Sequence, residues 1–222
     1  MVDEWSLRRE LVRAGRELAH RGMTPGAAGN LSARLAEGRF LVTPSGGAKG
    51  RLRPGDLLVI DATGAVLEGS GRAVAGPEGT GRPSSETPMH LAIYARFPHV
   101  AAIVHAHPPA ATALAITHHP LAVEAVPEAL FALGAVPAVP YISPASPALG
   151  EAVARSLDQG DGALLLNHGA VTIGRSVAEA LSRMEVLEAV ADLTLRAIPA
   201  GPVVPLPPAE VARLRAIWQS RR

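Results

Sequence analysis

The sequence contains no cysteine and a single lysine, Lys49. Without cysteine the chain can form no disulfide, thiol nucleophile or thiolate metal site, so a transition metal would need histidine and carboxylate ligands. Lys49 lies in a loop of small residues rather than in an apolar pocket that would lower the pKa of its amine. We therefore expect no catalytic imine on a lysine, because that chemistry needs an unprotonated amine.

Aromatic residues make up only 3% of the 222 residues, and the formal net charge is +1. With few aromatics and no basic block, no nucleic-acid partner is expected. No apolar run reaches the roughly 18 residues of a membrane span, and the opening "MVDEWSLRRELVRAG" lacks the apolar core of a signal peptide. The sequence thus predicts a cytoplasmic protein without a membrane partner. Few asparagines and glutamines, with 20 prolines, suggest a thermophilic source, although genome composition could produce the same bias.

Hydrophobic periodicity and turn residues divide the chain into helices and strands. Helices are expected over residues 5–20, 84–98, 108–118, 146–160, 176–198 and 207–221. Strands are expected over residues 30–35, 39–44 and 100–107, with hairpins over 56–69 and 162–174. Residues 69–83 form a long glycine-rich loop, and residues 129–144 a loop with short extended pieces. With no repeat or clear boundary, we expect a single domain over residues 1–222, with a mixed or largely antiparallel sheet covered by helices.

Two histidines, one residue apart, end the apolar run "AAIVHAH". Side chains at i and i+2 of a strand point to the same face, so His105 and His107 can reach one ion together. His168 ends a second apolar run in "LLLNHGA". Three protein ligands leave one coordination position open, which is typical of a catalytic zinc site. The alternative is structural, because imidazoles at strand ends also bond to backbone or water.

Asn167, beside the third histidine, can support a ligand by a hydrogen bond or simply occupy a turn. The pair "THHP" offers adjacent imidazoles, but side chains of adjacent residues diverge on an irregular segment. The remaining histidines are expected to be structural, helical or exposed: His20, His90, His99, His118 and His119.

Segments of small residues supply candidate anion sites. "PSSE" places Ser84 and Ser85 before a helix, where hydroxyls and free backbone N–H groups suit a phosphate. Helix capping explains the two serines equally well. Glu86 follows in the first turn, where the helix dipole favours an acid even without a function. "TPSGG" and "GAAGN" are two further loops able to cradle a phosphate.

Taken together, "GNLSAR", "TPSG", "PSSE", "HAH" and "NHG", in this order and spacing, resemble the class II aldolase/adducin family over roughly residues 5–195. Within that family the resemblance points to the fuculose-phosphate aldolases and ribulose-phosphate epimerases. It implies an α/β fold, a three-layer α/β/α sandwich around a mixed, mainly antiparallel sheet, usually assembled as a homotetramer. The implied activity is that of a metal-dependent lyase, a class II aldolase acting on a C–C bond of a small sugar phosphate through a zinc-stabilised enediolate.

The resemblance also implies roles for individual residues. The histidines would bind Zn²⁺ or another divalent ion such as Mn²⁺ or Co²⁺, and Glu86 would be the acid/base that carries the proton. The implied ligands are His105, His107 and His168. The implied phosphate contacts are Asn30, Ser45, Gly46, Ser84 and Ser85.

Two tyrosines that assist proton transfer in fuculose-phosphate aldolase have no counterpart here. The matching loop "VEAVPEALFALG" and the C-terminal tail contain none, and Tyr94 and Tyr141 lie elsewhere. Glu124 or Glu128 could take that role. An epimerase, a dehydratase or a decarboxylating enzyme on the same scaffold therefore stays open. A non-catalytic adducin-like module is a further alternative. It predicts that one or more of the three histidines would be replaced, whereas all three are present.

Overall fold

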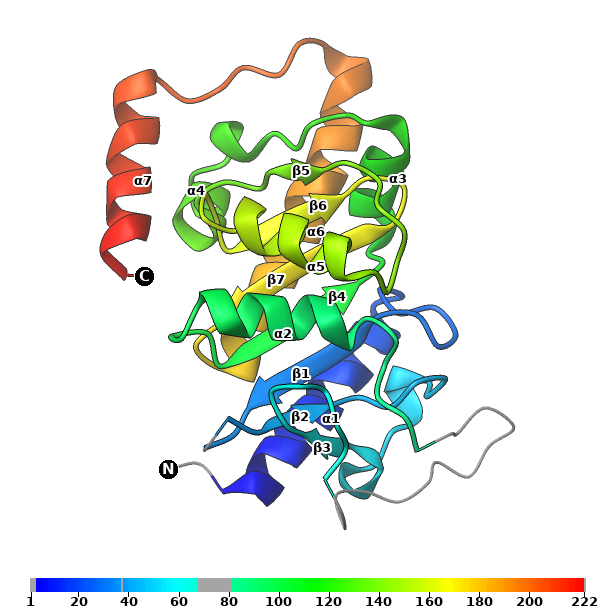
Figure 1. Ribbon diagram of the computed structural model, residues 1–222. Helices are drawn as coiled ribbons and strands as arrows, with labels where there is room; N and C mark the ends of the chain where they lie inside the picture. The colour runs from blue at the N-terminus through cyan, green and yellow to red at the C-terminus, as the bar shows by residue number, and fades with distance from the viewer. Residues whose placement is uncertain (1–2, 37, 68–80, 222) are drawn as a thin grey trace.

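The computed structural model describes residues 3–36, 38–67 and 81–221 (Figure 1). Most of the predicted glycine-rich loop, residues 69–83, therefore lies outside the described residues. In the described part, no helix is both long and apolar enough to cross a membrane.

A seven-stranded sheet, in the order β3-β2-β1-β4-β7-β6-β5, runs through the described residues. Its strands are β1 (Asn30–Arg34), β2 (Phe40–Val42), β3 (Leu58–Ile60), β4 (Ala102–Ala106), β5 (Ala138–Val139), β6 (Gly162–Leu165) and β7 (Gly169–Gly174). Neighbouring strands are antiparallel except for β5 and β6, which are parallel. The predicted mixed, mainly antiparallel sheet is confirmed.

Helices cover both faces of this sheet (Figure 1). They are α1 (Glu4–His20), α2 (Thr87–Arg96), α3 (Pro109–Thr117), α4 (Pro127–Leu133), α5 (Pro147–Ser156), α6 (Val177–Ala197) and α7 (Pro208–Arg221). Short 3₁₀ turns occupy η1 (Lys49–Arg51), η2 (Pro54–Asp56), η3 (Val123–Ala125) and η4 (Ile198–Ala200).

The two faces of the sheet carry separate apolar cores, as the alternation of side chains along a strand requires. Leu31 and Val104 share one core with apolar residues of α1, α3 and α6. Ile103, the neighbour of Val104, shares the other core with Ile93 of α2 and Val153 of α5. The result is the predicted three-layer α/β/α sandwich.

Two local predictions need correction. The segment 129–144 is not a loop throughout, because α4 begins at Pro127 and buries Leu130 and Leu133. Proline suits the first helical position, since the N–H that it lacks would have no partner there. Of the hairpin over residues 56–69, the described part to residue 67 has one regular strand, β3, and its return is an isolated antiparallel bridge between Ile60 and Val66 with a bond from Leu67 N–H to Val59.

Candidate active site

The three predicted ligands meet where β4 ends and the turn after β6 leads into β7. His105 lies in β4, His107 follows that strand, and His168 immediately precedes β7. The antiparallel pairing of β4 with β7 brings these chain segments together. Candidate ligand atoms of the three side chains lie within 4.8 Å of one another, which fits three histidines around one ion.

The ring of His105 is held in one orientation. Its Nδ1 lies 2.9 Å from the carbonyl oxygen of Ala170, which can only accept, so Nδ1 carries the hydrogen. Nε2 then bears a lone pair, and it is buried without a hydrogen-bond partner. A backbone carbonyl that orients one ring nitrogen while the other is left bare is the usual arrangement of a metal-binding histidine.

Glu86, the N-cap residue of α2, directs its carboxylate toward the three histidines. Oε2 lies 3.1 Å from Nε2 of His105, and Oε1 lies 3.3 Å from Nε2 of His168. Oε1 is also a buried atom without a hydrogen-bond partner. A lone-pair nitrogen and a carboxylate oxygen so close together repel each other unless a cation lies nearby. These orphaned atoms therefore fit a divalent ion bound by the three histidines.

Burial sets the protonation states that such a site needs. Desolvation lowers the pKa of His107 to about 4 and also lowers the pKa of His168. These two imidazoles are therefore neutral near pH 7, and the neutral form is the one that binds metals. Burial on its own raises the pKa of Glu86, but attraction to His105 and His168 in their protonated forms, and the hydrogen bond from Asn30, outweigh it. With the histidines neutral, the N–H of Asn30 and a bound cation are the groups that would keep Glu86 a carboxylate.

The residues predicted to contact phosphate come from three loops that meet beside Glu86. The backbone N–H of Ser45 bonds to the carbonyl of Arg82 at 2.9 Å, and that of Ser84 bonds to Thr43 at 3.2 Å. The "TPSG" and "PSSE" segments therefore lie side by side. A cavity of about 150 Å³ is lined by these predicted contacts: Asn30, Ser45, Gly46, Ser84 and Ser85. Glu86 and His107 line it too; the phosphate role of the five residues stays a prediction.

The alternative of helix capping by the two serines is wrong. The N-cap of α2 is Glu86, and no side chain accepts a hydrogen bond from the first turn as a cap. The Oγ atom of Ser84 instead accepts from the backbone N–H of Glu86 at 3.3 Å. Ser85 is exposed beside the cavity.

Lys49 is a residue of the site that the sequence reasoning missed. Lys49 was expected to lie in a loop that leaves the pKa of its amine unchanged, and this is wrong, because Lys49 is 2% exposed and burial lowers that pKa to about 8. Its Nζ donates to the carbonyl oxygens of Ala27 at 2.6 Å and Gly47 at 2.8 Å. These bonds join the "GAAGN" loop to the "PSGG" loop and favour the ammonium form. Lys49 also lines the cavity beside Glu86.

Asn167 occupies the turn rather than supporting a ligand. Its φ of 59° is left-handed, and its Oδ1 lies 2.8 Å from Nε2 of His118. The two glutamates considered as substitutes for tyrosine also lie away from the cavity beside Glu86. Glu124 pairs with Arg215 at 2.6 Å, and Glu128 lines a different cavity.

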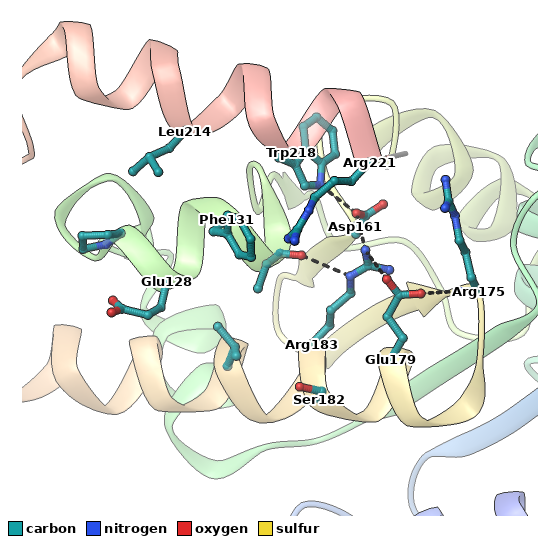
Figure 2. Close-up of a pocket in the computed structure, with 13 residues that line it drawn as sticks. Glu128, Phe131, Asp161, Arg175, Glu179, Ser182, Arg183, Leu214, Trp218 and Arg221 are labelled. Atoms are coloured by element: carbon teal, nitrogen blue, oxygen red, sulfur yellow. Dashed lines mark hydrogen bonds and ion pairs between the residues drawn. The ribbon is translucent and has the colours of Figure 1, made fainter.

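That second cavity, of about 920 Å³, lies between α4, α6 and α7 (Figure 2). Its most buried carboxylate, Asp161, accepts from Nε1 of Trp218 at 2.7 Å and pairs with Arg183 at 2.9 Å. Arg183 also pairs with Glu179 at 3.0 Å. Neither Glu86 nor any of the predicted metal ligands and phosphate contacts lines this cavity. The bond between Trp218 and Asp161 connects the C-terminal helix α7 to the start of β6.

The geometry of this site agrees with the comparison to protein families. Residues 9–195 match the family described as Class II Aldolase and Adducin N-terminal domain. The chain belongs to the class II aldolase and adducin family. The resemblance drawn from the five sequence motifs is thereby confirmed.

Individual members of the family differ in their reactions. The chain is 37% identical to a methylthioribulose-1-phosphate dehydratase of Methylococcus capsulatus, over 84% of this chain and 92% of that protein. It is 34% identical to a 3-oxo-tetronate 4-phosphate decarboxylase of Escherichia coli K12, over 96% and 97% of the two chains. A solved L-fuculose 1-phosphate aldolase superposes with a TM-score of 0.83 at 28% identity, covering 96% of each chain. The class of sugar-phosphate lyases is supported, whereas aldol cleavage, the homotetramer and the thermophilic source stay predictions.

Proposed function

We propose that the chain is a divalent-metal-dependent lyase that removes water from a small ketose phosphate. The observation that carries this proposal is a single ionised carboxylate, Glu86, between the three histidines and the cavity of the phosphate loops. Glu86 is the one carboxylate among the described residues that line that cavity.

Dehydration next to a keto group needs two proton transfers, and one carboxylate can perform both. Glu86 first takes the proton from the carbon beside the keto group. The C–O bond to the neighbouring hydroxyl then breaks, and the same carboxyl group gives its proton to the departing oxygen, so water leaves. Glu86 returns to its resting state without an external proton. The cycle starts with the carboxylate, the form that the hydrogen bond from Asn30 favours.

The other described residues of the site would bind and orient the substrate. When bound, a divalent ion supplies Lewis-acid stabilisation of the negative charge that develops on the substrate oxygens. Lys49 and the loops that carry Ser45 and Ser84 would hold the phosphate, whose binding energy orients the reacting carbons. The name of the 37% identical relative supports a ketose 1-phosphate as the substrate class.

Decarboxylation of a phosphorylated 3-keto acid is the second candidate. It is favoured by the end-to-end match with the decarboxylase of Escherichia coli K12. In that reaction the C–C bond to the carboxylate breaks, CO₂ leaves, and Glu86 delivers a proton to the carbon. Glu86 must then start protonated, which the hydrogen bond that Asn30 donates to Oε2 disfavours. Aldol cleavage is the third outcome to test.

The products separate these reactions. The metal-loaded protein would be incubated in turn with methylthioribulose 1-phosphate, 3-oxo-tetronate 4-phosphate and L-fuculose 1-phosphate, and the products followed by mass spectrometry. We expect loss of one water from the first compound, and at least a hundredfold slower loss with Glu86→Gln. Release of CO₂ or of an aldehyde fragment, with no loss of water, would overturn the dehydratase.

A further inference from the structure

Five buried polar side chains form one continuous row of hydrogen bonds between β1 and α2. Tyr94 Oη lies 2.8 Å from Ser32 Oγ, which lies 2.6 Å from His90 Nδ1. His90 Nε2 lies 2.6 Å from Asn30 Oδ1, and Asn30 Nδ2 lies 2.8 Å from Glu86 Oε2. All five residues are at most 9% exposed. We call this row, from Tyr94 to Glu86, the β1–α2 chain.

The spacing of the five residues explains how the β1–α2 chain forms. Glu86, His90 and Tyr94 are four residues apart, so they lie along one side of α2. Asn30 and Ser32 are two residues apart, so they share one face of β1. Packing that side of α2 on that face of β1 interleaves the two sets.

The direction of every hydrogen bond in the β1–α2 chain follows by elimination. A carboxylate only accepts, so the amide nitrogen of Asn30 donates to Glu86, and the amide oxygen must accept from Nε2–H of His90. Neutral His90 then has a bare Nδ1, which accepts from the hydroxyl of Ser32. That hydroxyl oxygen in turn accepts from Tyr94. Burial keeps His90 neutral, as its pKa of about 3 indicates.

Every donor in the β1–α2 chain thus points toward Glu86. Aligned hydrogen bonds polarise one another, so the row favours negative charge on Oε2 and holds this oxygen in place. Oε1 has no hydrogen-bond partner and lies 3.3 Å from His168. The two carboxylate oxygens of Glu86 therefore differ in their surroundings: Oε2 accepts a hydrogen bond from Asn30, and Oε1 accepts none.

We propose that His90, Ser32 and Tyr94 are positioning residues that anchor Oε2 of Glu86 through Asn30, leaving Oε1 as the oxygen that takes and returns the proton. The proton-carrying role of Oε1 rests on the proposed function, whereas the anchoring of Oε2 does not. Three apolar side chains in place of His90, Ser32 and Tyr94 could fill the same space without the cost of burying polar groups. A purely structural role therefore does not explain why these positions are polar.

The first test is independent of activity. Histidine is labelled with ¹⁵N in the metal-loaded protein, and the tautomer of His90 is read from its nitrogen resonances, assigned by their loss in His90→Gln. We expect hydrogen on Nε2 and a bare Nδ1, with a shifted Nδ1 resonance in Ser32→Ala. Hydrogen on Nδ1, or an Nδ1 resonance unaffected by Ser32→Ala, would show that the hydrogen bonds of the β1–α2 chain do not run as proposed, even if the proposed reaction is right.

The second test separates positioning from stability. Ser32→Ala and Tyr94→Phe leave the cavity lining unchanged, so we expect unchanged metal content, KM within twofold, and kcat reduced about five- to tenfold by loss of a cooperative hydrogen bond. The matched control is Thr172→Val, because the buried Thr172 hydroxyl bonds to Ala180 at 2.8 Å, outside the β1–α2 chain. We expect a comparable loss of stability but an unchanged kcat. Equal kcat in all three variants would overturn the positioning role.

The two tests distinguish the possible failures. If no sugar phosphate reacts, the proposed function fails, while the tautomer of His90 still decides whether the β1–α2 chain exists. If water is lost as proposed but Ser32→Ala and Tyr94→Phe turn over like the control, the dehydratase stands and the positioning role is refuted.

Discussion

Asn30 of β1 and His105 of β4 are directly paired across two antiparallel strands. The amide of Asn30 holds Oε2 of Glu86 at 2.8 Å, and Nε2 of His105 lies 3.1 Å from the same oxygen. The register of one strand pair therefore places a proposed metal ligand beside the residue that holds the proposed acid/base. A slip of one residue would turn one of them to the opposite face of the sheet, so the site depends on this register.

Glu86→Gln should separate metal binding from chemistry. The amide keeps the size of the side chain but cannot take a proton, so turnover should fall about 10²- to 10⁴-fold. The three histidines are unchanged, and we expect the metal content to stay within a factor of two of the wild type. The check is kcat together with metal analysis of the same sample. A Glu86→Gln protein that turns over normally would remove Glu86 from the mechanism.

The close approach of Gly29 to β4 should matter for the site. Its φ is +72°, and an added Cβ would lie 2.7 Å from the carbonyl oxygen of His105. We expect Gly29→Ala to lower the free energy of unfolding by more than the roughly 1 kcal/mol of a left-handed alanine, and to weaken metal binding.

Gly22→Ala is the matched control. Gly22 has the same φ of +72°, but an added Cβ would meet nothing within 4 Å. Chemical denaturation and metal titration of both variants would measure the difference. Equal effects in the two would show that contact with His105 is unimportant.

The clustering of the three histidines was predictable because its signals are local. Two apolar runs end at His105 and His168, and the ends of neighbouring strands meet once the sheet forms. The phosphate loops were recognised as segments, but their assembly depends on bonds between distant residues, such as that from Lys49 to Ala27. The burial of Lys49 is a product of that closure, and for this reason sequence reasoning took it for an ordinary loop lysine.

The row of hydrogen bonds that holds Glu86 could not be predicted from the sequence alone. His90 was expected to be merely helical, because its role appears only when α2 packs on β1 and meets Ser32. The spacing of Glu86, His90 and Tyr94 by four residues was visible in the sequence, yet it carries no meaning until the partner strand is known. The helix α4 was missed for a different reason, because Pro137 and Pro140 beyond its end dominated the prediction.

The metal-free protein should lose stability in mild acid. In the folded state the pKa of His90 is about 3 and that of His107 about 4, whereas an unfolded histidine titrates near 6.5. Between these values the unfolded chain binds more protons, so the free energy of unfolding falls as pH decreases below about 6.5. The slope is about 1.4 kcal/mol per pH unit for each such histidine.

Urea denaturation of chelator-treated protein at pH 7, 6 and 5 would measure this slope. His90→Gln should give a shallower dependence by about one proton. His20→Gln, which changes an exposed histidine, should leave the slope unchanged. A free energy of unfolding that does not change between pH 7 and pH 5 would contradict the neutral, buried state of His90.

Lys49→Met should impair substrate binding more than chemistry. It removes the ammonium beside the phosphate loops and leaves the carbonyls of Ala27 and Gly47 without their donor. We expect KM for the phosphorylated substrate to rise about tenfold or more, with a smaller effect on kcat. Arg51→Met, at an exposed cation of the same 3₁₀ turn, is the control. The phosphate role of Lys49 fails if both variants bind substrate equally well.

Metal content measures directly whether His105, His107 and His168 hold one divalent ion, as we propose. The purified wild type and His107→Ala would be loaded with Zn²⁺, Mn²⁺ or Co²⁺, dialysed and measured by elemental analysis. We expect about one ion per chain in the wild type and its loss in His107→Ala, because the two remaining histidines cannot complete the site. A wild type that takes up none of the three metals, or a variant that keeps its ion, would contradict this proposal.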